Sequence, residues 1–352
     1  MLKDLRLSNF RPFESLAFRP APGPNFLVGD NAQGKTSLLE AVCLLLRLQS
    51  PRTNFPSECA RFGSDHFAIH GHFQSHHLQL HWQGRLKHFS LDSKPQSTTS
   101  DYLGVGRVAW IANADMGLVG GPSSGRRRFL DFLGAQLIPG YVKTLRFYER
   151  SLRARNALLK QQAPRREIDA FDEPLAEAGD ALTQFRMRVS ADFVQHARLA
   201  YARIADGREE LRVKFVPGCS GPMREALIES RADEARLRHT VVGPHRDDLT
   251  LLLGECEAST FGSEGQQRSV ALALKVGQAL RLTEATGSPP LYLVDDVFGE
   301  LDAARRHNLL ALLPGDAQML ITTTGTSWLE EVPWNAARFR VANGAIAPIP
   351  NP

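Results

Sequence analysis

The sequence predicts an α/β fold that is built from both ends of the chain and interrupted by a largely helical insertion. Three observations support this prediction. Apolar runs typical of buried strands lie near the two ends of the chain, at 26–28, 291–294 and 319–322. A stretch with the apolar spacing of a helix, 35–48, follows the first run. Between about 126 and 238, long charged faces and few strand signals predict helices.

The other elements follow from local patterns. Apolar residues alternate with polar ones over 5–18, which predicts short strands that end at the prolines of 20–24. Alternation returns over 66–91 and predicts an antiparallel meander, followed by a polar loop at 95–100. Later in the chain we expect strands at 213–216 and 249–253, a helix over 270–283, a glycine-rich connection at 117–125 and a Ser/Gly turn at 262–265.

Composition narrows the class of protein. A chain of 352 residues with 43% apolar and 23% charged residues excludes wholesale disorder and is long enough for two domains. Its net charge is only +4, so a polyanionic partner would have to meet a local basic patch. The four cysteines lie far apart, a spacing that excludes a zinc ribbon and does not suggest a disulfide framework. The longest apolar run, 41–46, is too short to span a bilayer, and the start of the chain lacks an apolar signal core. We therefore expect a soluble, cytoplasmic protein with no membrane partner.

A phosphate-binding loop is the strongest local signal. The residues Gly29, Asp30, Asn31, Ala32, Gln33, Gly34, Lys35 and Thr36 fit the pattern G-x-x-x-x-G-K-[ST], between a buried strand and an apolar helix. In such loops the backbone N–H groups point inward at phosphate oxygens, and the helix N-terminus adds its positive dipole end. Lys35 would supply a charge to the β- and γ-phosphates, and the Thr36 hydroxyl would ligate Mg²⁺.

Two acids predict the second half of the same site. Asp295 and Asp296 end the apolar run that begins at Leu291. A carboxylate at the carboxyl end of a strand beside a phosphate loop is placed to complete the Mg²⁺ shell, so Asp295 is the candidate ligand. Asp296 would orient or deprotonate an attacking water. The alternative for these acids is a solvated turn, with Asp296 as a helix cap.

A second anion-receiving surface is a weaker prediction. Ser263 and Gly265 precede the expected helix, and this arrangement exposes a hydroxyl and free N–H groups. Spacing alone favours the simpler alternative, in which Ser263 only caps the helix.

The combined order of these motifs resembles ABC-type ATPase heads. The phosphate loop is followed by Ser263, Gly265 and Gln266 in an S-x-G-Q-Q-R segment, and then by Asp295-Asp296 and the segment 299–302. Within that class the chain resembles the RecF family over nearly its whole length. The resemblance is carried by Leu5, Leu7, Asn9, Phe10 and Arg11, by Gly120-Gly121-Pro122 with 126–131, by Tyr148, Leu152, Arg155 and Asn156, and by the G-P-H-R-D-D segment 243–248.

The resemblance implies an α/β ABC-type P-loop ATPase head with an antiparallel β subdomain and a helical inserted lobe. Its lobe I would comprise 1–115 and 263–352, and lobe II would be 116–262. The gap between the loop and Ser263 admits only a short helical arm, at about 141–210.

The resemblance also implies an activity and partners. Ser263, Gly265 and Gln266 of one copy would contact the γ-phosphate of ATP held by Lys35 of another, which gives an ATP-gated homodimer with weak ATPase activity. The family binds gapped or junction DNA, single- or double-stranded, and with RecO and RecR helps to load the recombinase RecA. Lys35 and Asp296 would be the catalytic residues, with ATP and Mg²⁺ as cofactors.

Three departures from related patterns bear on mechanism. Asp296 stands where many ABC ATPases have Glu, and a shorter side chain is consistent with slow turnover. The threonines 322–324 stand where transporter ATPases have a switch histidine. Asn113 and Asp115 lie where the RecF family usually has Pro-Glu-Asp, so the role of this loop stays open, as does that of Arg11.

A basic block provides a candidate DNA surface. Lys143, Arg146, Arg150, Arg153 and Lys160 fall at helical spacings and line one face. A one-sided row of cations suits phosphate backbones, and without interleaved aromatic residues it predicts sequence-independent binding. The alternative is a solvated face that is salt-bridged to the acids of 167–180.

Histidines are concentrated between 66 and 88. His70 and His72 share a strand face, which leaves open a metal site as well as the simpler interpretation of solvent-facing residues.

Two other functions also remain open for the whole chain: a nucleotide-bound DNA scaffold that does not hydrolyse ATP, and the energy-supplying subunit of a transporter.

Overall fold

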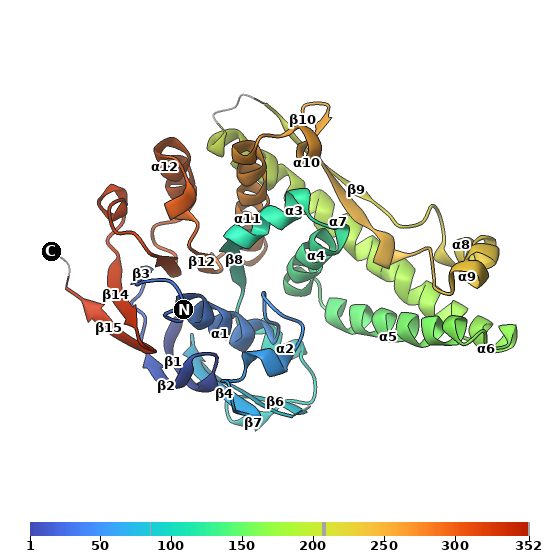
Figure 1. The fold of residues 1–352 in the computed structure, drawn as a ribbon, viewed down its shortest axis with the longest axis horizontal. Coiled ribbons are helices and arrows are strands. Elements are labelled where there is room, and N and C mark those ends of the chain that lie inside the picture. The colour runs from blue at the N-terminus through green and yellow to red at the C-terminus, as the bar shows by residue number, and fades with distance from the viewer. Residues whose placement is uncertain (85, 206–208, 351–352) are drawn as a thin grey trace. The chain divides into compact units, whose positions relative to one another are not determined.

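The computed structural model describes residues 1–84, 86–205 and 209–350 (Figure 1). The chain divides into two compact units. Unit 1 consists of Met1–Asp115 and Lys275–Pro352, with a short segment that begins at Arg203. Unit 2 consists mainly of Met116–Ala202 and the residues up to Leu274. The second boundary between the units therefore lies inside helix α11, later in the chain than the expected boundary at 262.

A six-stranded, mostly parallel sheet forms the centre of unit 1. Its strand order is β15-β14-β3-β13-β12-β8, and only β15 runs antiparallel to its neighbour among these strands. Strand β3 from the start of the chain lies between β13 and β14 from its end (Figure 1), so both chain ends build one sheet. The strands are β3 (Pro24–Val28), β8 (Val108–Ala112), β12 (Leu291–Asp295), β13 (Met319–Thr323), β14 (Ala337–Ala342) and β15 (Ala345–Ile349).

A second, antiparallel sheet in unit 1 confirms the expected meander. Its order is β2-β1-β4-β5-β6-β7. Most large apolar residues of β1, β2, β4 and β5 face the core, and Leu5 and Ile69 are fully buried, whereas Leu86 of β6 is exposed. The strands are β1 (Leu2–Phe10), β2 (Phe13–Phe18), β4 (His66–Phe73), β5 (His76–Gln83), β6 (Leu86–Leu91) and β7 (Lys94–Pro95).

Helix α1 (Lys35–Arg47) packs against strands of both sheets. Every residue of α1 except Thr36 is buried, so the helix lies wholly in the core. Three charged side chains, those of Lys35, Glu40 and Arg47, are therefore buried with the helix, and each has partners. The Arg47 guanidinium donates to the carbonyl oxygens of Leu103 and Gly106 at 2.8 and 3.0 Å. The other helices of unit 1 are η1 (Pro56–Cys59), α2 (Ser100–Gly104), η4 (Phe298–Glu300), α12 (Ala303–Leu312) and η5 (Leu329–Glu331), and η2 (Asn113–Met116) ends at the boundary.

Unit 2 is mostly helical, as the insertion pattern predicts. Its helices are α3 (Gly117–Gly120), α4 (Ser123–Leu137), α5 (Tyr141–Lys160), α6 (Arg165–Asp169), α7 (Asp172–Ile204), α8 (Met223–Glu229), α9 (Arg231–Leu237), η3 (Pro244–Arg246), α10 (Ala258–Phe261) and the first part of α11 (Glu264–Thr286). A three-stranded sheet of order β11-β10-β9 completes it, with β9 (Leu211–Val216), β10 (Asp248–Leu253) and β11 (Cys256–Glu257).

The glycine-rich segment 117–125 differs from the expected connection, because most of it belongs to α3 and α4. Its glycines allow a tight junction between these helices. A side chain on Gly121 would place Cβ only 2.4 Å from the carbonyl oxygen of Gly117. Close backbone approach, not loop flexibility, accounts for glycine here.

Helices α5 and α7 share one hydrophobic core in unit 2. Tyr141 and Tyr148 of α5 pack with Leu175 and Leu182 of α7, and Met223 of α8 joins them. This packing pairs a helix of 20 residues with the start of one of 33 residues. The short helical arm expected at about 141–210 falls on these two helices.

Candidate active site

The phosphate loop joins β3 to α1, and each of its two motif glycines meets a steric requirement. A Cβ on Gly29 would lie 2.2 Å from the carbonyl oxygen of Val341 on β14. Gly34 has a φ of 101°, a left-handed conformation that side chains disfavour, and the Phe13 ring lies against it. The spacing of the motif therefore matches the space that the neighbouring strands leave.

The Lys35 ammonium is held over its own loop. Its Nζ donates to the carbonyl oxygens of Gly29 at 2.5 Å and Asp30 at 2.7 Å. Burial lowers the pKa of Lys35, and the nearby carboxylates of Asp296 and Asp295 oppose that shift. The predicted loop residues thus serve in two ways: Gly29 and Asp30 hold the lysine, whereas residues 31–36 line a pocket.

The pocket has a volume of about 320 Å³. Besides the loop and Ser37, it is lined by Pro12, Arg52, Asp295, Asp296 and Thr322. The loop and both predicted acids therefore meet at one cavity, although they lie more than 250 residues apart in the chain. Pro12 and Arg52 are additions that sequence reasoning missed, because neither belongs to a recognised motif.

The two predicted metal-ligating side chains contact each other. Thr36 Oγ1 donates to Asp295 Oδ1 at 2.8 Å. The strand end of β12 and the first turn of α1 thus bring together a hydroxyl and a carboxylate, which are both hard oxygen ligands of the kind that Mg²⁺ prefers. Asp296 follows with a φ of 51°, and burial raises the pKa of its carboxyl, an effect that the charge of Lys35 opposes.

Thr322 is a site residue that sequence reasoning did not assign. Its hydroxyl donates to Asp295 Oδ1 at 2.8 Å and accepts from the backbone N–H of Asp296 at 2.9 Å. Thr322 stands at the carboxyl end of β13, beside β12 in the parallel sheet. The signal that could have identified Thr322 in the sequence is the run of three threonines that begins at the end of the predicted core strand 319–322.

The Asn113–Asp115 loop contacts one of these acids, Asp296. Asn113 Nδ2 donates to the carbonyl oxygen of Asp296 at 2.8 Å. Asp115 accepts from the Ala112 N–H at 2.7 Å and lies 3.3 Å from the Lys275 ammonium. Burial raises the pKa of Asp115, and Lys275 opposes that shift. Asn113, which differs from the residue usual in the RecF family, therefore supplies an amide that holds the backbone of Asp296.

Ser263 and Gln266 begin helix α11 in unit 2 with reciprocal hydrogen bonds. The Ser263 hydroxyl accepts from the Gln266 N–H at 3.3 Å, and the Gln266 side chain accepts from the Ser263 N–H at 2.7 Å. This is a capping box, so in the single chain the helix-cap alternative describes Ser263. Gln266 Nε2 also donates to Glu209 at 2.7 Å. Ser263 remains exposed, and Gly265 is partly buried.

The G-P-H-R-D-D segment takes part in a polar network inside unit 2. His245 Nε2 faces the carbonyl oxygen of Thr240 at 2.9 Å and therefore carries the ring proton, so Nδ1 accepts from the Tyr148 hydroxyl at 2.7 Å. Burial lowers the pKa of His245 to about 4. Arg186 of α7 contacts both Asp131 and Asp247 at 2.9 Å. The segment thus joins α4, α5 and α7.

Arg155 forms a second buried network in unit 2. The guanidinium donates to Asp172 at 2.9 Å, to Glu234 at 3.0 and 2.7 Å and to Thr240 at 2.9 Å. Asn156 accepts from the N–H and hydroxyl of Thr240, both at 2.8 Å. Together these contacts show that several motifs of the resemblance position secondary structure within this unit.

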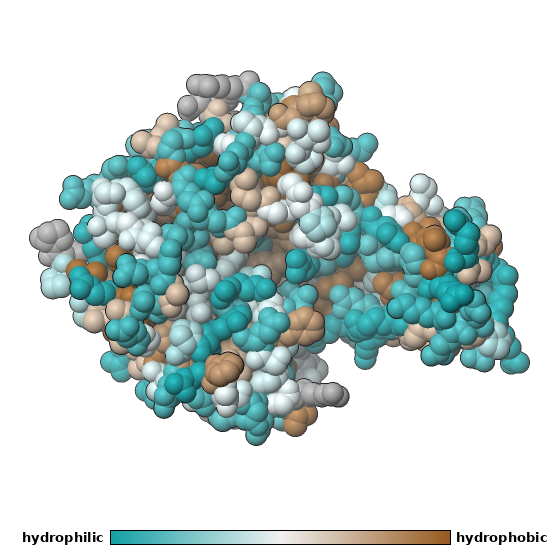
Figure 2. Space-filling model, viewed as in Figure 1, coloured by the Kyte–Doolittle hydropathy of each residue, from teal (hydrophilic) through white to brown (hydrophobic). Residues whose placement is uncertain are grey.

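The basic residues predicted on α5 are all exposed. Tyr148 and Leu159 are buried on the other side of the helix, and Figure 2 shows a mainly hydrophilic surface over the α5–α6 segment at the right of the view. In the described part of the chain, only Arg153 of this basic face has a salt bridge, at 4.0 Å to Glu149. Arg155, which is not part of the face, is the α5 residue that pairs with the following acidic stretch.

The histidines lie on the antiparallel sheet of unit 1. His70 and His81 face each other with 2.9 Å between their Nε2 atoms, and His72 lies 2.8 Å from Asp4. Burial lowers the pKa of both His70 and His81. Across the residues that the structure covers, no three His, Cys, Asp or Glu side chains are grouped so that they could hold a metal ion.

Comparison with known proteins places these features in a family. The AAA domain family matches residues 4–113. The chain is 33% identical to the DNA replication and repair protein RecF of Lactococcus lactis subsp. cremoris, with 98% of each chain covered. It superposes with a TM-score of 0.89 on a solved structure of the recombination mediator protein RecF with ATP in the RecFOR pathway, at 27% identity over 99% of this chain and 97% of that chain.

A more distant likeness is to an Smc head bound to the C-terminal winged-helix domain of ScpA, with a TM-score of 0.58 at 12% identity over 99% of this chain and 96% of that chain. This match concerns the fold alone. Within the described residues, none of the helices combines the length and apolar character that crossing a membrane requires. The fold is that of ABC-type ATPase heads, and by sequence over its whole length the chain belongs to the RecF family of DNA replication and repair proteins.

Proposed function

We propose that this protein is an ATP-dependent DNA-binding protein of recombinational repair and replication restart, in which two copies close on ATP and slow hydrolysis resets the dimer. The observation that carries the proposal is the pocket in which the phosphate loop and the two acids meet. Thr36, Asp295 and Thr322 are joined there by hydrogen bonds of 2.8 Å. The choice of nucleotide is supported by the solved RecF relative, whose structure is that of a complex with ATP.

The residues of the pocket fit ATP and Mg²⁺. Lys35 donates to carbonyl oxygens of its own loop, and phosphate oxygens would replace these acceptors without a change of fold. Thr36 and Asp295 would hold Mg²⁺, which when bound neutralises charge on the β- and γ-phosphates. Asp296 would orient the attacking water, with its backbone fixed by Thr322 and Asn113.

The proposed dimer contact rests on the start of α11. Ser263, Gly265 and Gln266 would present N–H groups and a hydroxyl to the γ-phosphate bound by a second copy. A contact that only ATP can make gives a differential affinity between open and closed states, which is what a nucleotide switch requires. In this arrangement the capping box orients Ser263 before the second copy arrives.

The proposed DNA surface is the basic face of α5. Lys143, Arg146, Arg150 and Lys160 are exposed and form no salt bridge with any residue that the structure describes, so their charge is available to a phosphate backbone. Binding would be independent of base sequence. The relative's place in the RecFOR pathway supports RecO and RecR as partners. The outcome that the family resemblance implies is the loading of RecA.

Sedimentation velocity tests the dimer directly. The Asp296→Asn variant would be compared in Mg²⁺ with ATP and with ADP, without DNA. We expect a monomer in ADP and a dimer in ATP, and Ser263→Arg should abolish the dimer. The same oligomeric state with both nucleotides would contradict nucleotide-gated closure.

Phosphate release tests hydrolysis separately. We expect slow release over multiple turnovers in the wild-type protein and its loss in Asp296→Asn. A wild-type protein that binds ATP without releasing phosphate would instead be a non-hydrolysing scaffold.

A further inference from the structure

Glu40 is a fully buried carboxylate about one turn along α1 from Thr36, the last residue of the phosphate loop. Arg11 donates to both of its oxygens, at 2.9 and 3.0 Å. Ser50 donates to it at 2.6 Å and Arg52 at 3.1 Å. Burial alone would raise its pKa, but these hydrogen bonds, above all those from Arg11 and Ser50, hold the pKa below its usual value. The carboxylate is therefore charged and fully engaged.

The partners of Glu40 belong to two segments that border the nucleotide pocket. Arg11 lies in the β1–β2 turn, and its neighbour Pro12 lines the pocket. Arg52 lies in the loop after α1 and lines the pocket itself. The Ser50 hydroxyl, which Glu40 holds, accepts from the N–H groups of Arg52 at 3.0 Å and Thr53 at 3.1 Å. One buried carboxylate thus fixes both segments.

The two arginines are held differently. Arg11 forms a bidentate pair and its side chain is 22% exposed, whereas Arg52 contacts Glu40 through Nη1 and is 43% exposed. Within the described residues, the Arg52 side chain forms no other hydrogen bond, so its remaining N–H donors are available. A guanidinium fixed on one side and open on the other is suited to bridge a carboxylate and a phosphate.

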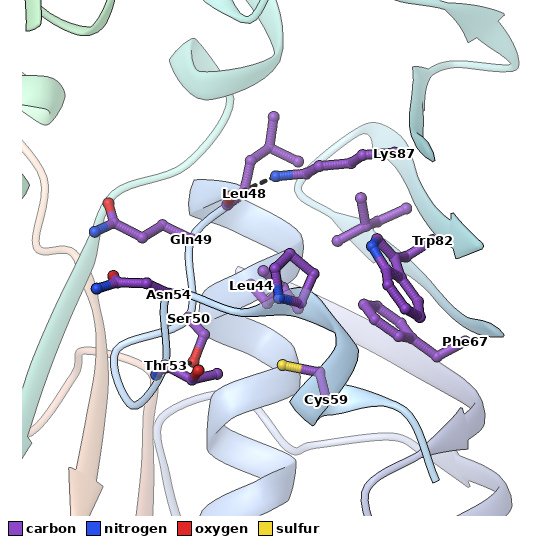
Figure 3. A pocket seen from close by; sticks show the side chains of 12 residues that line it. Leu44, Leu48, Gln49, Ser50, Thr53, Asn54, Cys59, Phe67, Trp82 and Lys87 are labelled. Carbon is purple, nitrogen blue, oxygen red and sulfur yellow. Dashed lines mark hydrogen bonds between the residues drawn. The ribbon is translucent and has the colours of Figure 1, made fainter. Parts of the chain in front are cut away.

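The far side of the Arg52 loop borders a second, smaller pocket of about 140 Å³ (Figure 3). Ser50, Thr53 and Asn54 of the loop line it, opposite the stacked rings of Phe67 and Trp82. The loop therefore borders a hollow on this side. On the side of α1, the hydrogen bonds that lead from Glu40 to Ser50, and from Ser50 to the backbone of Arg52 and Thr53, hold it.

We propose that Glu40 is a positioning residue of the nucleotide pocket, which holds the 50–53 loop through Ser50 so that Arg52 faces the polyphosphate. This inference rests on the proposed function, since it assumes that the pocket binds ATP. Glu40 acts through Arg52 and does not itself contact the nucleotide. Replacing Glu40 by Gln would turn an amide N–H₂ toward the arginines and release the loop.

Equilibrium binding of a fluorescent ATP analogue tests the proposal in the full-length protein. Arg52→Ala should weaken binding by about tenfold, the scale of one charge-assisted hydrogen bond to phosphate. Glu40→Gln and Ser50→Ala should each weaken it by threefold or more in the wild-type background, as rough expectations, but by less than about twofold in the Arg52→Ala background. Glu14→Gln is the matched control, because Glu14 pairs with Arg61 at 3.1 Å on the surface; it should leave binding unchanged.

Two results would overturn the proposal. An Arg52→Ala variant that binds the analogue like wild type would show that Arg52 does not face the phosphates. If Ser50→Ala weakened binding equally in the wild-type and Arg52→Ala backgrounds, the loop would support the fold and would not act through Arg52. Ser50→Ala retains the buried charge pair, so it decides the question even where Glu40→Gln fails to fold. The Lys35→Ala variant tests the nucleotide site separately from the role of Glu40. Unchanged binding of the analogue in that variant would refute the nucleotide site itself.

Discussion

Thr322 joins the two acids of the pocket, and its replacement by valine isolates that link. Valine keeps the shape of threonine but lacks the hydroxyl, so Thr322→Val removes the bond to Asp295 and leaves the Asp296 N–H without its acceptor. Thr322 is 1% exposed, and water cannot readily replace the lost group. Asp295 keeps its hydrogen bond from Thr36. The damage should therefore fall mainly on Asp296.

The size of the effect follows from what holds Asp296. Its φ of 51° costs about 1–2 kcal/mol for a residue with a side chain, and the hydrogen bond from its N–H to Thr322 helps to offset that cost. Leaving such a donor unpaired costs about 1–3 kcal/mol. If this whole cost of about 1–3 kcal/mol is added to the activation free energy of hydrolysis, kcat falls by about 5- to 150-fold.

Steady-state ATPase kinetics measure this. Thr322→Val should lower kcat within that range while KM for ATP changes by less than about twofold, because Lys35 and the loop are unaltered. Thr322→Ser retains the hydroxyl and is the matched control, with kcat expected near that of wild type. A Thr322→Val variant with wild-type kcat would refute the reasoning, as would a Thr322→Ser variant that is equally slow.

Three further predictions concern unit 2. Arg155→Met leaves the buried carboxylate of Glu234 without its salt bridge and should lower the free energy of unfolding by about 3–5 kcal/mol in urea titrations. The exposed neighbour change Arg153→Met should cost little, and equal losses would contradict the role of the buried network. In the folded protein His245 stays neutral down to about pH 4, whereas in the unfolded chain it binds a proton as the pH falls below about 6.5. Acid therefore favours the unfolded state, and the free energy of unfolding should drop by about 2 kcal/mol between pH 7 and 5. This drop should be smaller in His245→Gln, and an identical pH dependence would refute the assignment. Reversing Arg146, Arg150 and Arg153 to Glu should weaken DNA binding and flatten its salt dependence in fluorescence anisotropy, and unchanged binding would exclude this face.

Local sequence determined those parts of the protein whose cause is local. The phosphate loop is a contiguous motif whose glycines and lysine have fixed spacing, so it was predictable down to Thr36. The core strands β3, β12 and β13 were predictable because buried parallel strands are continuous apolar runs. Strands β8 and β14 were missed, since short runs that contain Ala or Arg, as in Val108–Ala112 and Ala337–Ala342, carry weak periodicity and depend on pairing with distant neighbours.

Tertiary structure decided which distant residues act together. Nothing local to Thr322 indicates that its hydroxyl joins Asp295 to Asp296, because that contact arises only from the pairing of β12 with β13. In the sequence, Glu40 is only a polar residue within an apolar helix. It becomes the buried partner of Arg52 only because α1 packs against strands of both sheets. The physical reason is the same in both cases. A hydrogen bond between residues far apart in the chain depends on topology and register, which the sequence pattern of either residue alone does not contain.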